Sequence, residues 1–231
     1  MTGVSGSQIF LWVGLPYLAF GIFVVGHIWR YRRDQFGWTC RSTQLLESRL
    51  LAWGSNLFHF GALAAIAGHV LGLLVPADVT TTVGVSEGGY HLLSASAGTV
   101  AGLGCVIGLL ILLYRRAFVA RIRVTTTYTD VAVYALLVAV IGLGIVETFF
   151  TGVLGGGYNY RVTVGVWFRG IFLLHPHPAL MASAPLLYQA HAAVAWLLFA
   201  LWPFSRLVHA WSVPVQYLGR PYILYRRRFA R

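Results

Sequence analysis

Five apolar stretches of about 20 residues or more, separated by short polar connections, constrain this chain more than any other feature. About 20 apolar residues in a helix cross the hydrocarbon core of a bilayer. Only 10% of the 231 residues are charged, whereas a soluble domain has about 25%. We therefore predict an all-α integral membrane protein, one domain over residues 1–231, with spans at about 9–29, 51–75, 92–114, 129–149 and 181–208.

The arginines predict the orientation of these spans. All 17 basic residues are arginine, and they alternate strongly between connections. Five lie in 30–50, four in 115–128 and six from the end of the last span onward, against none in 76–91 and two in 150–180. Since basic loops stay in the cytoplasm, we expect the N-terminus outside, the tail 210–231 in the cytoplasm, and a location in the cell membrane. The formal net charge of +11 could suggest binding to nucleic acid, but the placement of the arginines beside the spans argues against it.

Four histidines inside the apolar stretches are the candidate site residues. An ionisable side chain in a membrane span is costly, so it is a functional candidate by default. His59 and His69 are ten residues apart, which leaves them about 80° apart on one helix and ~15 Å apart along its axis. His191 and His209 are 18 residues apart, which predicts one shared face and a rise of ~27 Å. A bend at Pro203 is one way to reconcile the two spacings.

The second and fifth spans run antiparallel, so depth pairs the histidines across them. We expect His59 beside His209 near the cytoplasmic side, and His69 beside His191 nearer the outside. Two imidazoles from opposite helices suit a b-type haem with both axial positions filled, and such a haem transfers electrons. No Cys-x-x-Cys is present to hold a cluster or attach haem covalently. The alternative for each histidine is a hydrogen bond between helices.

A second group of residues opens the third span on the predicted outer side. His91 lies beside Tyr90 and four residues after Glu87, close to the expected position of the outer haem. A donor and a carboxylate beside an electron acceptor suit quinol oxidation, since one binds the oxygen and the other accepts a proton. An interfacial helix cap is the alternative. His27, His175 and His177 are expected to be interfacial or solvated.

Four segments resemble the gamma subunit of respiratory nitrate reductase, a family of membrane cytochromes b. They are 55–59 (Ser-Asn-Leu-Phe-His), 68–69 (Gly-His), 121–127 (Arg-Ile-Arg-Val-Thr-Thr-Thr) and 203–217 (Pro-Phe-Ser-Arg-Leu-Val-His-Ala-Trp-Ser-Val-Pro-Val-Gln-Tyr). The likeness extends from about residue 10 to 225. It implies five spans, two b haems, and assembly with an iron–sulfur beta subunit and a molybdenum-containing alpha subunit that reduces nitrate.

The resemblance also implies roles for individual residues. His59 and His209 are expected to bind the proximal haem, and His69 and His191 the distal haem, which takes electrons from menaquinol or ubiquinol. The family often has a basic residue near the start of the third span, where this chain has His91. Haem propionates need cationic partners, and we predict Arg206 for this role. The alternatives are Arg30, Arg115 and Arg116.

Other functions and partners stay open at the level of sequence. The chain also suits a membrane cytochrome that feeds a sulfur-metabolism or heterodisulfide-type reductase, a haem-free anchor, or a metal transporter. The basic segments 30–50 and 210–231 suit either a partner subunit or the anionic lipids of the bilayer.

Overall fold

The structure is a computed structural model, and it describes residues 4–39, 41–154, 158–212 and 219. All regular elements within these residues are helices, as the apolar stretches predict. Most of the tail 210–231 lies outside the described residues. Five helical segments in the described part are long and apolar enough to cross a membrane: Gly6–Arg33, Arg49–Leu74, Glu87–Phe118, Tyr128–Phe150 and Leu186–Phe204.

Several of these spans combine an α-helix with a π or 3-10 turn. Their elements are α1 (Gly6–Ile9), η1 (Phe10–Gly14) and α2 (Leu15–Arg33); α3 (Arg49–His69) and η2 (Val70–Leu74); α5 (Glu87–Phe118); α7 (Tyr128–Val146) and η3 (Glu147–Val153); and α10 (Leu186–Leu201) and η5 (Trp202–Phe204). The shorter elements are α4 (Ala77–Thr82), α6 (Ala120–Arg123), η4 (Tyr160–Val162), α8 (Val164–Phe172), α9 (Pro178–Ala182) and η6 (Arg206–Trp211).

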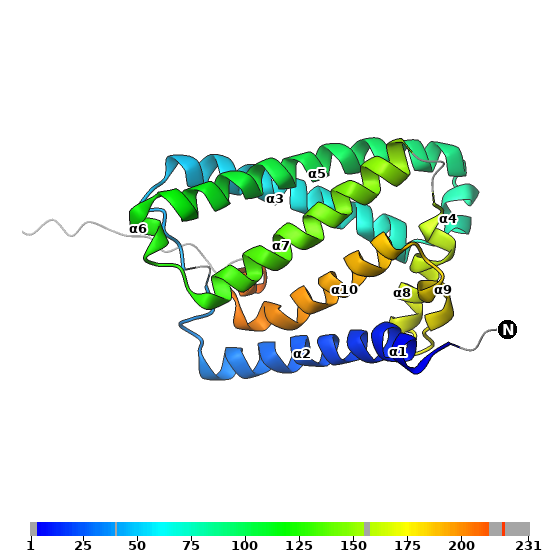
Figure 1. Ribbon diagram of the computed structural model, residues 1–231, viewed down its shortest axis with the longest axis horizontal. Helices are drawn as coiled ribbons and strands as arrows, with labels where there is room; N and C mark the ends of the chain where they lie inside the picture. Colours follow the sequence, from blue (N-terminus) through cyan, green and yellow to red (C-terminus); the bar gives the residue numbers. More distant parts are fainter. Residues whose placement is uncertain (1–3, 40, 155–157, 213–218, 220–231) are drawn as a thin grey trace, which may run out of the picture.

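The long helices form one bundle (Figure 1). α3 and α5 pack against each other along one side, and α2 lies along the other. α10 lies between them and packs against α2 and α7. The connection with α6 lies at one end, which we call the arginine-rich end, while α4, α8 and α9 lie at the opposite end.

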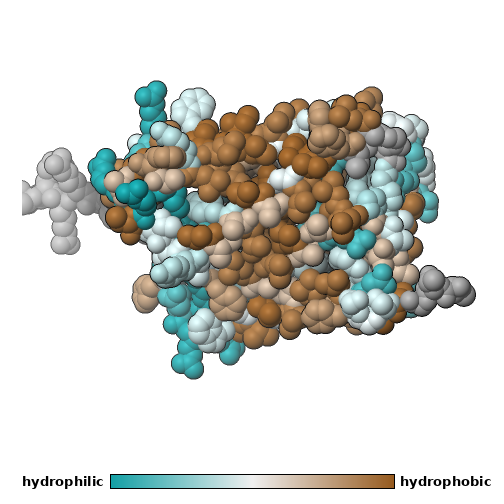
Figure 2. Space-filling model, in the orientation of Figure 1, coloured by the Kyte–Doolittle hydropathy of each residue, from teal (hydrophilic) through white to brown (hydrophobic). Residues whose placement is uncertain are grey.

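The middle of the molecule has an apolar surface (Figure 2). A hydrophobic band lies between hydrophilic groups at the two ends, and large apolar side chains such as Phe60, Val100 and Leu186 are exposed. A helix pairs its own backbone hydrogen-bonding groups, so it can lie in the apolar core of a bilayer. Apolar side chains exposed on such helices are therefore suited to face lipid. The chain is therefore a multi-pass membrane protein, as predicted.

Polar residues fix where the third and fourth spans begin. The Ser86 hydroxyl accepts a hydrogen bond from the Gly89 N–H at the start of α5. At the start of α7, the Thr127 hydroxyl accepts from the Asp130 N–H, and the Asp130 carboxylate accepts from the Thr127 N–H. Such caps satisfy amides that a helix leaves without partners.

Glycines set the close packing of α3 on α5. A Cβ added at Gly61 would lie 2.8 Å from the Ala101 carbonyl oxygen, and one at Gly54 would lie 2.9 Å from Cγ2 of Ile111. Gly54 and Gly61 both face α5, on the helix that carries His59. They serve helix packing, which small residues permit in membranes.

The prediction for the fifth span was wrong at both ends. The predicted segment 181–208 begins inside α9, and α10 ends at Leu201. Pro203 lacks an amide hydrogen and disfavours a continuing helix, and Ser205 is extended with φ −120° and ψ −179°. The Arg30 guanidinium donates to the Pro203 carbonyl at 2.7 Å and to the Ser205 carbonyl at 2.8 Å. The chain therefore breaks at Pro203, and His191 and His209 do not share a face of one helix.

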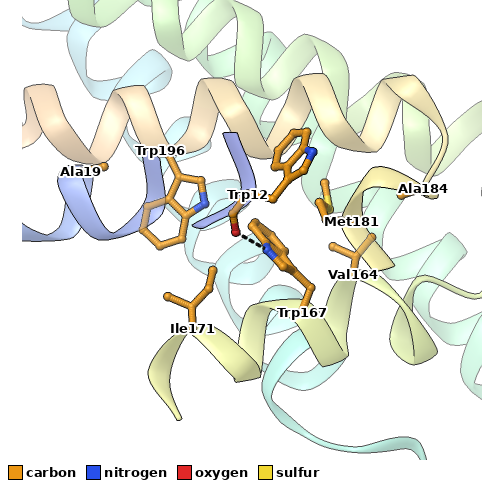
Figure 3. Close-up of a cluster of buried hydrophobic side chains, with 8 residues drawn as sticks. All are labelled: Trp12, Ala19, Val164, Trp167, Ile171, Met181, Ala184 and Trp196. Atoms are coloured by element: carbon orange, nitrogen blue, oxygen red, sulfur yellow. Dashed lines mark hydrogen bonds between the residues drawn. The ribbon is translucent and has the colours of Figure 1, made fainter. Parts of the chain in front are cut away.

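The connection 150–180 was predicted to be a loop, but part of it forms a buried helix. α8 places Trp167 in a core with Trp12, Met181 and Trp196 (Figure 3). The Trp167 indole donates a 2.7 Å hydrogen bond to the Trp12 carbonyl, which ties α8 to the first span. An apolar helix of nine residues is too short to register as a span.

Candidate metal centres

The first candidate centre joins α3 to the turn after the fifth span. His59 lies on α3 and His209 lies on η6, yet their Nε2 atoms are 3.5 Å apart. Metal–imidazole bonds of about 2 Å would put two such nitrogens about 4 Å apart. The structure therefore holds this predicted pair within about half an ångström of the spacing that one shared metal needs.

The second candidate centre lies further along the same helix. His69 is the last residue of α3, and His191 lies in the first half of α10. Their ring centroids are 6.0 Å apart and their planes differ by 25°. The structure thus brings together both histidine pairs that depth predicted. The break at Pro203 is what allows this, because the segment to His209 does not rise as a continuous α-helix.

Three of the four rings are oriented by the same local hydrogen bond. The Nδ1 atoms of His59 and His69 lie 2.7 Å from the carbonyl oxygens of Ser55 and Ala65, four residues earlier. Nδ1 of His209 lies 2.7 Å from the Arg206 carbonyl oxygen. A protonated Nδ1 on a carbonyl leaves Nε2 with its lone pair, which is the tautomer that binds metal.

The donor set fits haem better than a metal held by protein alone. The described residues contain no cluster of three or more His, Cys, Asp or Glu side chains that could hold an ion. Two imidazoles at each centre fit an iron whose other four ligands come from a macrocycle. The side chains of His59 and His69 are exposed although both lie in a membrane-length helix. Their exposure leaves space beside both rings for a flat macrocycle.

Arg206, the predicted propionate partner, is held by a buried carboxylate. Its Nη2 and Nε atoms lie 2.6 Å and 2.8 Å from Oδ1 of Asp130, and Arg116 approaches the other carboxylate oxygen at 3.5 Å. Arg206 lies one turn before His209, on the arginine-rich end. Its role toward a propionate stays a prediction.

The alternative arginines have structural partners. Arg30 binds the carbonyls after α10, as described above. Arg115 donates to the Glu47 carboxylate at 2.6 Å and to the carbonyls of Glu47 and Thr43. Burial raises the pKa of Glu47, but hydrogen bonds from the Leu50 and Leu51 amides and from Arg115 outweigh it, so the pKa lies below its usual value. These arginines hold the loops at their end of the bundle.

The residues predicted for quinol line a pocket at the opposite end. Its volume is about 260 Å³, and its lining includes Glu87, Tyr90 and His91. Tyr160 and Arg161, from the connection after α7, also line it. The Tyr90 and Tyr160 hydroxyls are 3.3 Å apart, and both lie against Gly72, where an added Cβ would be 2.5 Å from the Tyr160 oxygen. The pocket therefore adjoins the turn that follows His69.

Arg161 organises this pocket. It donates to the Glu87 carboxylate at 3.0 Å, to the Pro76 carbonyl and to the Thr80 hydroxyl, and its guanidinium lies 3.9 Å from the centre of the Tyr90 ring. Glu87 thus lies beside His91 as the sequence predicts, but as the partner of an arginine that sequence reasoning left unassigned.

Three further residues near these sites were missed from the sequence. Tyr160 and Arg161 lie about 70 residues after Tyr90, so no local pattern connects them. Glu147 lies 3.7 Å from Nδ1 of His191. A carboxylate within an apolar span is itself a signal of function, and that signal identifies Glu147.

The fold and the paired histidines define a class: a five-span helical membrane protein with two pairs of adjoining histidines. The family model "Nitrate reductase gamma subunit" matches residues 8–228. The nitrate reductase gamma chain of Bacillus subtilis is 46% identical over 218 residues, covering 94% of this chain and 97% of that protein. The respiratory nitrate reductase 1 gamma chain of Escherichia coli is 35% identical over 217 residues, covering 92% and 94%. This chain belongs to the nitrate reductase gamma subunit family, as its sequence motifs predict.

A longer relative also matches. The nitrate reductase-like protein NarX of Mycobacterium tuberculosis is 49% identical over 228 residues, which cover 98% of this chain. The chain spans 35% of the length of that protein.

Proposed function

We propose that this chain is the membrane subunit of a quinol:nitrate oxidoreductase complex, which oxidises quinol and passes electrons through two b haems to an iron–sulfur subunit. Nitrate reduction belongs to a molybdenum-containing subunit. The observation that carries the proposal is the meeting of two histidine pairs at two depths of one bundle, with Nε2 atoms 3.5 Å apart in one of them. Membership of the gamma subunit family supports nitrate as the final acceptor.

The four histidines would hold the two haems in this proposal. His59 and His209 would hold the proximal haem, and His69 and His191 would hold the distal one. A b haem with both axial positions filled supplies a one-electron carrier with no open site for oxygen or substrate. The carbonyls of Ser55, Ala65 and Arg206 lie on Nδ1 of three of the rings, which would leave Nε2 available to a metal.

The pocket at the opposite end binds the quinol. His91 lies at the pocket wall, where its ring donates a hydrogen bond to a quinol oxygen, and the Glu87 carboxylate or water accepts the released proton. Arg161 fixes Glu87 and Tyr90 around the pocket. The pocket adjoins the turn after His69, so the oxidised quinol lies near the distal pair.

The arginine distribution supports a direction for the reaction. The arginine-rich end faces the cytoplasm, as basic connections do, and the quinol pocket faces outward. Protons from quinol then stay outside while electrons cross to the cytoplasmic side. The turnover generates a transmembrane potential without a proton pump.

Haem content tests the proposal. The purified chain should give two haems per polypeptide by pyridine haemochrome, with low-spin b-type bands after reduction. His59→Ala and His69→Ala should each leave one haem, and His27→Ala, a matched histidine change in the first span, should leave two. A chain without low-spin haem refutes the proposal.

Quinol oxidation is tested separately. His91→Leu should slow quinol-dependent reduction of both haems at least about tenfold, consistent with loss of a general base or hydrogen-bond donor. His177→Leu is the matched control, because His177 is also exposed and lies at the start of α9 at the same end. Equal rates in the two variants exclude the pocket as the quinol site.

A further inference from the structure

His191 differs from the other three paired histidines in what its second ring nitrogen meets. The other Nδ1 atoms lie on backbone carbonyls of their own segment at 2.7 Å. Nδ1 of His191 is buried and makes no hydrogen bond within the described part of the structure. The Glu147 carboxylate, on a different span, lies 3.7 Å from it.

The packing of α7 on α10 holds this ring in place. A Cβ added at Gly144 would lie 2.8 Å from Cε1 and 3.3 Å from Nδ1 of His191. The ring therefore lies directly against the α7 backbone, one turn before Glu147. The two side chains are only 17% and 13% exposed. Glu147 begins the π turn η3, where the helix widens, and π turns are frequent at functional sites.

A carboxylate inside a membrane span needs a functional or structural reason, because its burial is costly. Second-sphere chemistry gives one here. A metal-bound imidazole almost always donates its other N–H, and a carboxylate acceptor fixes the ring and raises its basicity as a ligand. The 3.7 Å separation between the Glu147 carboxylate and Nδ1 of His191 exceeds a hydrogen bond by less than about 1 Å.

We propose that Glu147 is the positioning residue of His191. It accepts the Nδ1 hydrogen, selects the tautomer that leaves Nε2 for iron, and makes His191 a more basic ligand than its three counterparts. The reduction potential of the distal haem is thereby lowered relative to that of a haem whose ligands all donate to carbonyls. This inference rests on the proposed function of the His69–His191 pair.

Redox titration and electron paramagnetic resonance of the purified membrane complex test this inference. Glu147→Gln keeps the shape and an acceptor but removes the carboxylate, and Glu147→Leu removes the acceptor. Both variants should shift the distal potential upward, by about tenfold in the reduction equilibrium for Leu, which is about 59 mV for one electron, and less for Gln. The g-values of the distal haem should change, and those of the proximal haem should not.

Thr148→Val is the matched control, since Thr148 is adjacent but its hydroxyl donates to the Gly144 carbonyl. It should leave both potentials unchanged. If Glu147→Leu loses the distal haem alone, a positioning role is supported. The shift of the distal haem potential is then measured in Glu147→Gln. An unchanged distal potential and signal in Glu147→Gln and Glu147→Leu overturns the inference. If the wild-type protein then still contains two haems, the proposed function stands and only the role of Glu147 is refuted. If the wild-type protein contains no haem, the proposed function itself is refuted.

Discussion

Gly108 on α5 gives the sharpest test of how the bundle positions His59. A Cβ added there would lie 2.7 Å from Cα of Phe58 and 2.9 Å from the Gly54 carbonyl oxygen. Favourable carbon–carbon contacts are about 3.5–4.0 Å, so Gly108→Ala forces α3 and α5 apart by about 1 Å. Backbone atoms lie on the far side of the contact, so no side-chain rotation relieves it. Phe58 precedes His59, and the displacement falls directly on the proximal pair.

The magnitude follows from two opposing effects. Overpacking costs about 1–3 kcal/mol, and replacing glycine by alanine inside a helix returns up to about 1 kcal/mol. Gly104→Ala is the matched control, because a Cβ there would lie 3.5 Å from Cα of Gly61, an ordinary contact. We expect Gly104→Ala to be neutral or slightly stabilising and Gly108→Ala to be less stable than it by about 1–3 kcal/mol.

Thermal unfolding by circular dichroism in detergent measures the stabilities, and the haem spectrum reports the centres. For a chain of this size, about 1 kcal/mol corresponds to about 2–4 °C. Gly108→Ala should also alter the proximal haem signal before the distal one, because only His59 adjoins the contact. Equal melting temperatures and equal haem spectra in the two alanine variants would refute the reasoning.

Three further predictions concern the two ends of the bundle. Arg115→Ala should destabilise the protein by about 1.5–3 kcal/mol, because the guanidinium's hydrogen bonds to the Glu47 carboxylate and to two carbonyls are lost, measured as a fall in melting temperature. The pKa of Glu47 is lowered in the folded protein. Its contribution to the stability of the fold is therefore full above its unfolded pKa of about 4.3 and is lost as pH falls through the folded pKa. A Glu47→Gln variant should show a weaker loss of stability over that acid range. Gly72→Ala should displace Tyr90 and Tyr160 and slow quinol oxidation while both haem spectra remain, as stopped-flow absorbance would show.

Hydropathy was sufficient to predict the first four spans. The predicted segments 9–29, 51–75, 92–114 and 129–149 correspond to the first four observed spans, because burial in lipid demands long apolar helices whatever the tertiary contacts. The predicted end of the fifth span was wrong because the true end depends on a specific interaction. Arg30, 173 residues before Pro203, donates to the carbonyls that the broken helix leaves free. No local pattern reports such a partner.

The pairing of the histidines was predictable for a different reason. Alternating arginines gave each span a direction, and direction gave His59 and His69 distinct partners at distinct depths. His191 and His209 do not share a helix face as their spacing predicts, because α10 ends at Leu201. The predicted pairing still holds, because the depth of each histidine depends on its position along its span and not on the helical phase between the two histidines.

The contact of Glu147 with His191 could not be predicted from the sequence of either helix alone. His59, His69 and His209 take their second-sphere acceptor from a carbonyl three or four residues earlier, so sequence spacing alone determines that contact. His191 lies near the start of α10, and the group facing its Nδ1 comes from α7, which contacts the ring through Gly144. Under the proposed function, one haem ligand would therefore be oriented by packing between spans, and the other three by contacts within their own segments. A change in the α7–α10 contact should alter the distal haem and leave the proximal one, whose two ligands depend on α3 and η6.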